Sequence, residues 1–121
     1  LEQPYKLAGS DNDYMDRDMV PLIPGLLIVL ADTLGDLSRA RAGGDITAIQ
    51  EISSRMAGQG STYGISALER MARCVERAAQ AGDSEAVSDL SEELNNMGKR
   101  YLETLRATHT EFMTNNNKEH L

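Results

Sequence analysis

Residues 52–68 decide the fold, and they read Ile52-Ser-Ser-Arg-Met-Ala-Gly-Gln-Gly-Ser-Thr-Tyr-Gly-Ile-Ser-Ala-Leu68. This stretch predicts the last turns of one helix, a bend of small residues at Gly58, Gly60 and Gly64, and the start of the next helix. The small side chains keep the surface low, and no reactive side chain lies on it. We therefore predict a docking surface on this part of the chain.

Composition limits the classes of protein to consider. A chain of 121 residues is typical of one domain with one core, and its apolar residues are mainly Leu, Ile, Met and Ala, which favours helices over sheets. The net charge of −7 argues against nucleic-acid binding, because neutralising phosphates requires a Lys/Arg patch. Cys74 is the single cysteine, so no disulfide forms within the chain. We expect no metal and no other cofactor.

The sequence also predicts where the chain resides and how it is divided. The longest apolar run, Leu26 to Ala31, is too short to cross a bilayer, and it follows an acidic segment rather than a basic one. We therefore predict a cytoplasmic protein that binds no membrane. The expected division is an acidic lead-in over residues 1–17, a helical bundle over 18–107 and a polar tail without periodicity over 108–121.

Apolar residues that recur every three or four positions predict four amphipathic helices. The first begins near Pro24, which suits a first helical turn, and ends at Gly43 and Gly44. Asp45 and Asp83 are the expected N-caps of the second and fourth helices. The short corners imply antiparallel neighbours. The predicted fold class is therefore all-α, an antiparallel up-down four-helix bundle with a short N-terminal lead-in helix.

Two further patterns concern the third and fourth helices. Ser66 with Glu69 forms a capping-box pattern at the predicted start of the third helix. Gly98, in the middle of the fourth helix, indicates a close approach to a neighbouring helix.

Helical periodicity determines which side of the second helix faces solvent. At about 100° per residue, Ser54 lies about 200° from both Ile52 and Met56, so it is predicted to point away from the core. The candidate partner-binding residues on and beside this outward strip are Thr47, Gln50, Glu51, Ser54, Ala57, Gly58 and Ser61.

No catalytic constellation accompanies this strip. His109 and His120 are predicted to lie near or in the polar tail, without a carboxylate or cysteine at helical spacing. Glu51, Glu92 and Glu93 are single carboxylates on exposed helical faces. The glycine bend is not a phosphate loop, because no strand precedes it and no Lys-Ser/Thr follows it. We expect the chain not to be an enzyme.

The stretch from Ser54 to Leu68, followed by Cys74-Val-Glu-Arg-Ala-Ala-Gln-Ala-Gly-Asp83, resembles the core of a histidine-containing phosphotransfer (HPt) domain. Members of that family carry His-x-x-Lys-Gly, a run of small residues to a second Gly, then Leu, and later an acidic residue and Ala-x-x-Gly-Asp. Gly58 and Gly64 are six residues apart, which is the spacing of the two glycines in the family. The resemblance covers roughly residues 18–105. It implies a two-component phosphorelay, with a response-regulator receiver domain or a histidine kinase as the partner.

By this resemblance, the phospho-accepting histidine falls on Ser54 and the accompanying lysine on Ala57. A serine hydroxyl lacks the nucleophilic imidazole nitrogen, and Ala57 lacks the charge that balances phosphate. The resemblance thus implies an HPt-like domain that docks partners without carrying phosphate. Ser54 is either the natural residue of a degenerate domain or a replacement in a working phosphotransfer protein.

Two readings outside phosphotransfer stay open. One is a structural or oligomerising helical-bundle module, in which the outward strip is merely solvated. The other is an enzyme regulator recognised through the acidic N-terminal segment. The expected oligomeric state of the HPt-like domain is a monomer.

Overall fold

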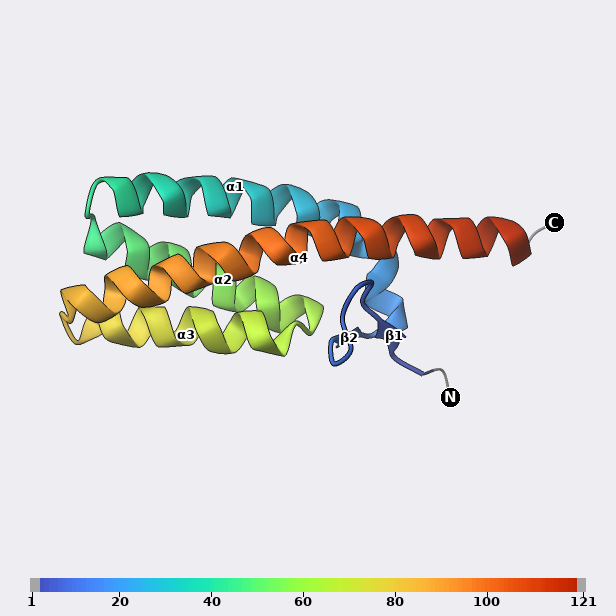
Figure 1. Cartoon of the computed structure of the whole chain (residues 1–121), viewed down its shortest axis with the longest axis horizontal. Coiled ribbons are helices and arrows are strands. Elements are labelled where there is room, and N and C mark those ends of the chain that lie inside the picture. The colour runs from blue at the N-terminus through green and yellow to red at the C-terminus, as the bar shows by residue number, and fades with distance from the viewer. Residues whose placement is uncertain (1–2, 120–121) are drawn as a thin grey trace.

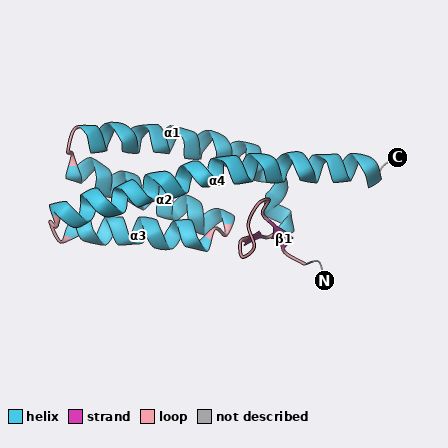
Figure 2. Cartoon of the chain, in the orientation of Figure 1, coloured by secondary structure: helices cyan, strands magenta, loops and turns pink. Residues whose placement is uncertain are grey.

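A computed structural model describes residues 3–119 as an antiparallel four-helix bundle preceded by a small hairpin (Figures 1 and 2). Each helix packs chiefly against two others. α1 and α3 each contact both α2 and α4. The predicted all-α four-helix bundle is confirmed. The helices are α1 (Ile23–Ala42), α2 (Ile46–Tyr63), α3 (Ser66–Gln80) and α4 (Ser84–Glu119).

The two Gly-Asp corners form as predicted. The side chain of Asp45 accepts a hydrogen bond from the Ala48 N–H at 3.0 Å, and that of Asp83 accepts one from the Ala86 N–H at 3.1 Å. The glycine before each aspartate has a positive φ, +63° and +70°, which a residue with a side chain rarely adopts. These corners set the antiparallel order of α1 with α2 and of α3 with α4.

The bend between α2 and α3 is shorter than the sequence predicted. α2 continues to Tyr63, so Gly58 and Gly60 are helical residues and not part of a bend. The chain turns at Gly64, which has a φ of +74°. Two glycines inside the helix therefore need explanations other than a turn.

The predicted capping box at the start of α3 is wrong. The N-cap is Ile65, which makes no side-chain cap hydrogen bond, and Ser66 is already the first helical residue. The reason is that the Ile65 N–H bonds to the Gly60 carbonyl at 2.7 Å, which closes α2 immediately before α3 begins. The carbonyl of Ile65 then accepts the Glu69 N–H at 3.1 Å.

Two helical glycines lie where helices meet closely. A Cβ on Gly60 would lie 2.8 Å from the backbone N of Glu69 and 3.1 Å from the Ile65 carbonyl oxygen. A Cβ on Gly98 would lie 2.5 Å from Cδ2 of Leu34 in α1, so the close approach predicted at Gly98 is confirmed. At Gly60 the neighbour is backbone, which cannot rotate aside as a side chain can.

The segment expected to fray after residue 108 is helical instead. α4 continues to Glu119 and projects beyond the bundle (Figure 1), while His120 lies outside the described residues. Thr108 is fully buried there, and its hydroxyl accepts the Ala8 N–H at 2.8 Å. The tail prediction failed because a distant part of the chain supports this end of α4.

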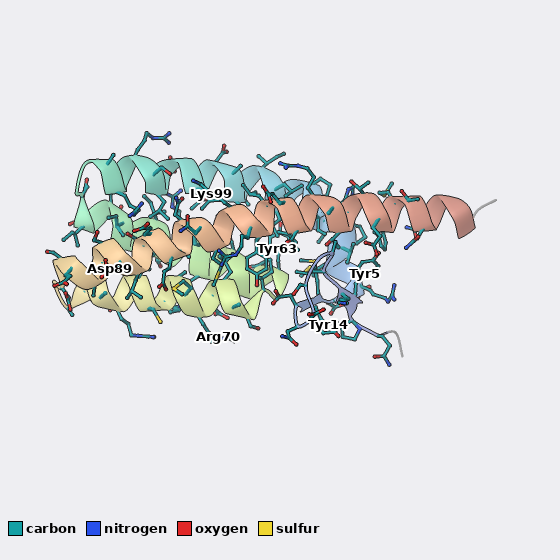
Figure 3. All side chains as sticks on the ribbon, in the orientation of Figure 1. Tyr5, Tyr14, Tyr63, Arg70, Asp89 and Lys99 are labelled. Atoms are coloured by element: carbon teal, nitrogen blue, oxygen red, sulfur yellow. The ribbon has the colours of Figure 1, made fainter. Side chains whose placement is uncertain are left out.

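That support is the N-terminal hairpin, in which β1 (Tyr5–Lys6) pairs antiparallel with β2 (Tyr14–Met15). Tyr5, labelled in Figure 3, lies in this hairpin. Its ring packs edge-on against Phe112 of α4, with ring centroids 5.7 Å apart. Leu7 and Met15 are each 1% exposed and extend the core to this end. The acidic lead-in is thus part of the folded domain.

The lead-in helix is a 3-10 helix, η1 (Arg17–Leu22), which continues directly into α1. Together they form a helical stretch, Arg17–Ala42, that is long and apolar enough to cross a membrane by length and composition alone. This is weak evidence for a membrane span, because core helices of soluble proteins share these properties. Leu26, Leu30 and Leu37 of this stretch are fully buried in the bundle. The domain therefore has the character of a soluble helical bundle.

Tyr101 of α4 provides a test of the contact between hairpin and bundle. Burial, together with the carboxylate of Asp13 that its hydroxyl faces, raises the pKa of Tyr101 to about 12. Because a phenol in the unfolded chain ionises near pH 10, this contribution to stability is complete below pH 10 and is lost as the pH rises toward 12. We expect the free energy of unfolding to fall across that window. Denaturant unfolding followed at several pH values measures it.

The control is Tyr101→Phe, which should flatten this pH dependence. Absorbance titration at 295 nm should show one tyrosine fewer in the late phase near pH 12. An unchanged late phase in the variant would mean that another tyrosine is responsible.

Candidate docking face

The structure places most of the predicted strip residues on the outer side of α2. Thr47, Glu51, Gly58 and Ser61 are exposed. Gln50 and Ser54 are half-buried, and both lie on the same side of the helix. We call the line of Thr47, Glu51, Ser54, Gly58 and Ser61 the α2 strip.

Ala57 does not belong to this strip, and its prediction as a partner-binding residue is wrong. It is fully buried, as is Ser53 one turn earlier, and Gly60 follows on the same side of α2. That side faces α3, because Gly60 abuts the backbone of Glu69. The buried face of α2 is wider than its apolar stripe, so small residues lie in the helix contact and not only on the surface.

Ser54 lies beside two charged side chains of α3. The carboxylate of Glu76 adjoins its hydroxyl, and Arg73 lies 3.0 Å from the same carboxylate. The Arg73 guanidinium, and to a smaller extent Ser54, hold the pKa of Glu76 below its usual value. A carboxylate, which is a potential proton acceptor, therefore adjoins the Ser54 hydroxyl. Because a carboxylate is a far weaker base than a serine alkoxide, Glu76 does not ionise this hydroxyl.

The opposite edge of the strip is tied to α1. Arg55 donates to Asp36 at 3.2 Å, and Gln59 donates to the hydroxyl of Thr33 at 3.0 Å. Arg55 first, and Arg39 second, hold the pKa of Asp36 below its usual value. These polar contacts fix the side chains that flank the strip, so that its profile is defined before a partner binds.

Three large apolar side chains on the outside of η1 and α1 were missed by the sequence analysis. Leu22, Ile28 and Val29 are 52%, 65% and 41% exposed. Val29 lies one turn before Thr33, whose hydroxyl accepts a hydrogen bond from Gln59 of α2. The exposed apolar surface of α1 therefore lies next to the contact between α1 and α2. A sequence signal existed, because Ile28 and Val29 depart from the inward stripe of Leu26 and Leu30.

A basic row on α3 was also missed. Arg70, Arg73 and Arg77 recur at helical spacing on one side of α3, although the chain carries a net charge of −7. Arg70 and Arg77 are exposed, and Figure 3 shows Arg70 on the outer side of α3. The candidate docking face therefore has a low centre on α2, an apolar edge on α1 and a basic edge on α3.

Of the two histidines, the structure describes His109. His109 is half-buried within α4, where the sequence had predicted the start of a polar tail. Between residues 3 and 119, no three His, Cys, Asp or Glu side chains cluster closely enough to hold a metal ion. Cys74 is a half-buried free thiol.

Comparison with protein-family models, with curated proteins and with solved structures finds no match for this chain. The geometry of the candidate docking face is therefore the basis for assigning a function.

Proposed function

We propose that this chain is an HPt-like signalling domain that docks a response-regulator receiver domain or a histidine kinase through the α2 strip. The proposal places the domain in a two-component phosphorelay in the cytoplasm. Support comes from the four-helix bundle and from the outer side of α2, where Ser54 lies. By the resemblance to HPt domains, Ser54 corresponds to the phospho-accepting histidine.

The observation that carries the proposal is the contrast between Gly58 and Gly60. Gly60 has a structural reason, since a Cβ there would meet the backbone of α3. Gly58 has none, because a Cβ there would meet nothing within 4 Å. A glycine in an exposed helix interior costs about 1 kcal/mol relative to alanine. Because no packing contact explains this loss of stability at Gly58, we infer that a partner must approach the helix closely there.

The proposed domain docks partners without carrying phosphate. A phosphoryl group leaving an aspartyl phosphate requires a nucleophile, and the serine hydroxyl at 54 stays protonated beside a carboxylate with a lowered pKa.

Gly58→Arg tests the docking surface. We expect it to abolish binding to receiver domains that bind the natural chain, because a long side chain in the middle of the strip prevents close approach. Binding is measured by biolayer interferometry against a panel of purified receiver domains.

The matched control is Asn96→Arg, which adds the same charge at an exposed position of α4, outside the α2 strip, and should leave binding unchanged. Circular dichroism should show that both variants stay helical. Equal affinity of Gly58→Arg and the natural chain would rule out the α2 strip as the contact.

The exposed Leu22, Ile28 and Val29 favour a second candidate, a self-associating helical module. Sedimentation velocity distinguishes the two candidates. A concentration-dependent dimer that Ile28→Asp abolishes would support self-association, whereas a monomer at all concentrations would support the docking domain.

A further inference from the structure

A cavity of about 470 Å³ opens at the end of the bundle away from the hairpin. It lies between the end of α1, the start of α2 and the first turns of α4, on the left in Figure 1. Its volume falls in the range of small-molecule sites. None of the α2 strip residues lines it.

The lining of this cavity combines an apolar floor with hydroxyl groups. Ile49 and Val87, at 3% and 2% exposed, are core residues that reach the cavity, and Ile46 adds further apolar surface. Serine side chains surround this floor, at positions 38, 84, 88 and 91. Such a mixture suits a ligand with an apolar portion and a polar head.

The positive charge of Arg41 indicates that the polar head of the ligand is an anion. Its side chain is 26% exposed, compared with 53% for Arg55 and 73% for Arg39. Its Nε donates to the hydroxyl of Ser91 at 2.9 Å, and fully buried Ser91 donates in turn to the Ser88 carbonyl at 3.2 Å. The guanidinium is therefore held in a fixed orientation beside the cavity.

The charge of Arg41 is incompletely balanced. Within residues 3–119, the carboxylate that approaches it is that of exposed Glu92, at 4.0 Å, which is the limit for an ion pair. A cation withdrawn from water without a close counter-ion is unfavourable, and a bound anion would relieve this. A guanidinium offers several further N–H donors for such an anion.

We propose that this cavity binds a small organic anion, a carboxylate or a phosphate monoester on a short alkyl chain. The anionic head accepts hydrogen bonds from Arg41 and the neighbouring serine hydroxyls, and the alkyl chain lies on Ile49 and Val87. This site is separate from the α2 strip, and it does not depend on the proposed docking function.

Titrations of the natural chain followed by ¹H–¹⁵N NMR test this site. The probes are hexanoate, hexyl phosphate, inorganic phosphate and hexylamine. We expect hexanoate or hexyl phosphate to shift the Arg41 Nε–H and the Val87 and Ser88 amide signals in a saturable way, and the tighter of the two identifies the head group. Inorganic phosphate, which lacks the tail, should bind more weakly, and the cationic hexylamine should leave these signals unshifted.

Arg41→Met should weaken binding of the better anion by at least about tenfold, because it removes the charged hydrogen bonds and keeps an apolar stem. Arg77→Met is the matched control on the exposed side of α3 and should leave affinity unchanged. If Arg41→Met does not fold, Ser38→Glu serves instead, since it places a carboxylate on an exposed position at the mouth. Equal shifts with hexylamine, or full affinity in the folded variants at 41 and 38, would overturn the proposal.

Discussion

Gly60→Ala is expected to lower the free energy of unfolding by about 2–3 kcal/mol, the size of effect typical of overpacking. The added Cβ would lie 2.8 Å from the Glu69 nitrogen and 3.1 Å from the Ile65 carbonyl oxygen, so α2 and α3 would have to separate. Separation would also strain the 2.7 Å bond from the Ile65 N–H to the Gly60 carbonyl. The better helix propensity of alanine, about 1 kcal/mol, does not offset these losses.

Gly58→Ala is the matched control, because it makes the same change in the same helix two residues earlier. Its Cβ would meet nothing within 4 Å, so alanine should raise the free energy of unfolding by up to about 1 kcal/mol. Urea unfolding followed by circular dichroism compares the two. If both variants were stabilised alike, the close approach of α2 and α3 at Gly60 would be contradicted.

From the proposed function, we expect Ser54→His to take up phosphate from a receiver domain, and we expect the unaltered chain not to do so. An imidazole at position 54 would supply the nitrogen nucleophile that attacks the phosphorus of a receiver's aspartyl phosphate, breaking the acyl P–O bond and forming an N–P bond. Glu76 already faces position 54 and could accept the other ring N–H, which orients the imidazole. Incubation with ³²P-labelled receiver domain should give label that is lost in acid.

Glu76→Gln in the Ser54→His background isolates the role of the carboxylate. Loss of a hydrogen bond to a charged group should slow uptake on the order of tenfold without preventing it. The natural chain and Ser61→His, which places imidazole elsewhere on the α2 strip, should stay unlabelled. Uptake by Ser61→His at the same rate would show that position 54 has no special geometry.

Features of the fold that depend on neighbouring residues were predictable from sequence. Asp45 and Asp83 cap helices through bonds to residues three positions later, and the glycines before them supply the φ that the corner requires. A close approach at Gly98 was also predictable, because a glycine inside a long amphipathic helix needs a reason, but its partner Leu34 was not.

Features that depend on distant parts of the chain were not predictable in this way. Gly60 suggested a bend by its local preference, but the backbone of α3 explains it within a helix. The segment after Thr108 looked like a tail because its support comes from the hairpin.

The candidate site was predictable in outline and not in its flanks. The direction of Ser54 followed from helical periodicity, and Gly58 and Ser61 are exposed as expected. Ala57 was misplaced, since the stripe of Ile52 and Met56 marks the centre of the buried face but not its width. Glu76 could not be paired with Ser54 from sequence, because only the packing of α3 on α2 brings them together.

The hydrogen bond from Ala8 to Thr108 spans 100 positions of the chain. During synthesis the hairpin leaves the ribosome long before α4 exists, so Tyr5 and Leu7 at first have no surface on which to pack. Closing so large a loop has an entropic cost, which falls once the corners have already brought α4 back along α1. The hairpin is therefore the part that completes the domain, after the helices have assembled.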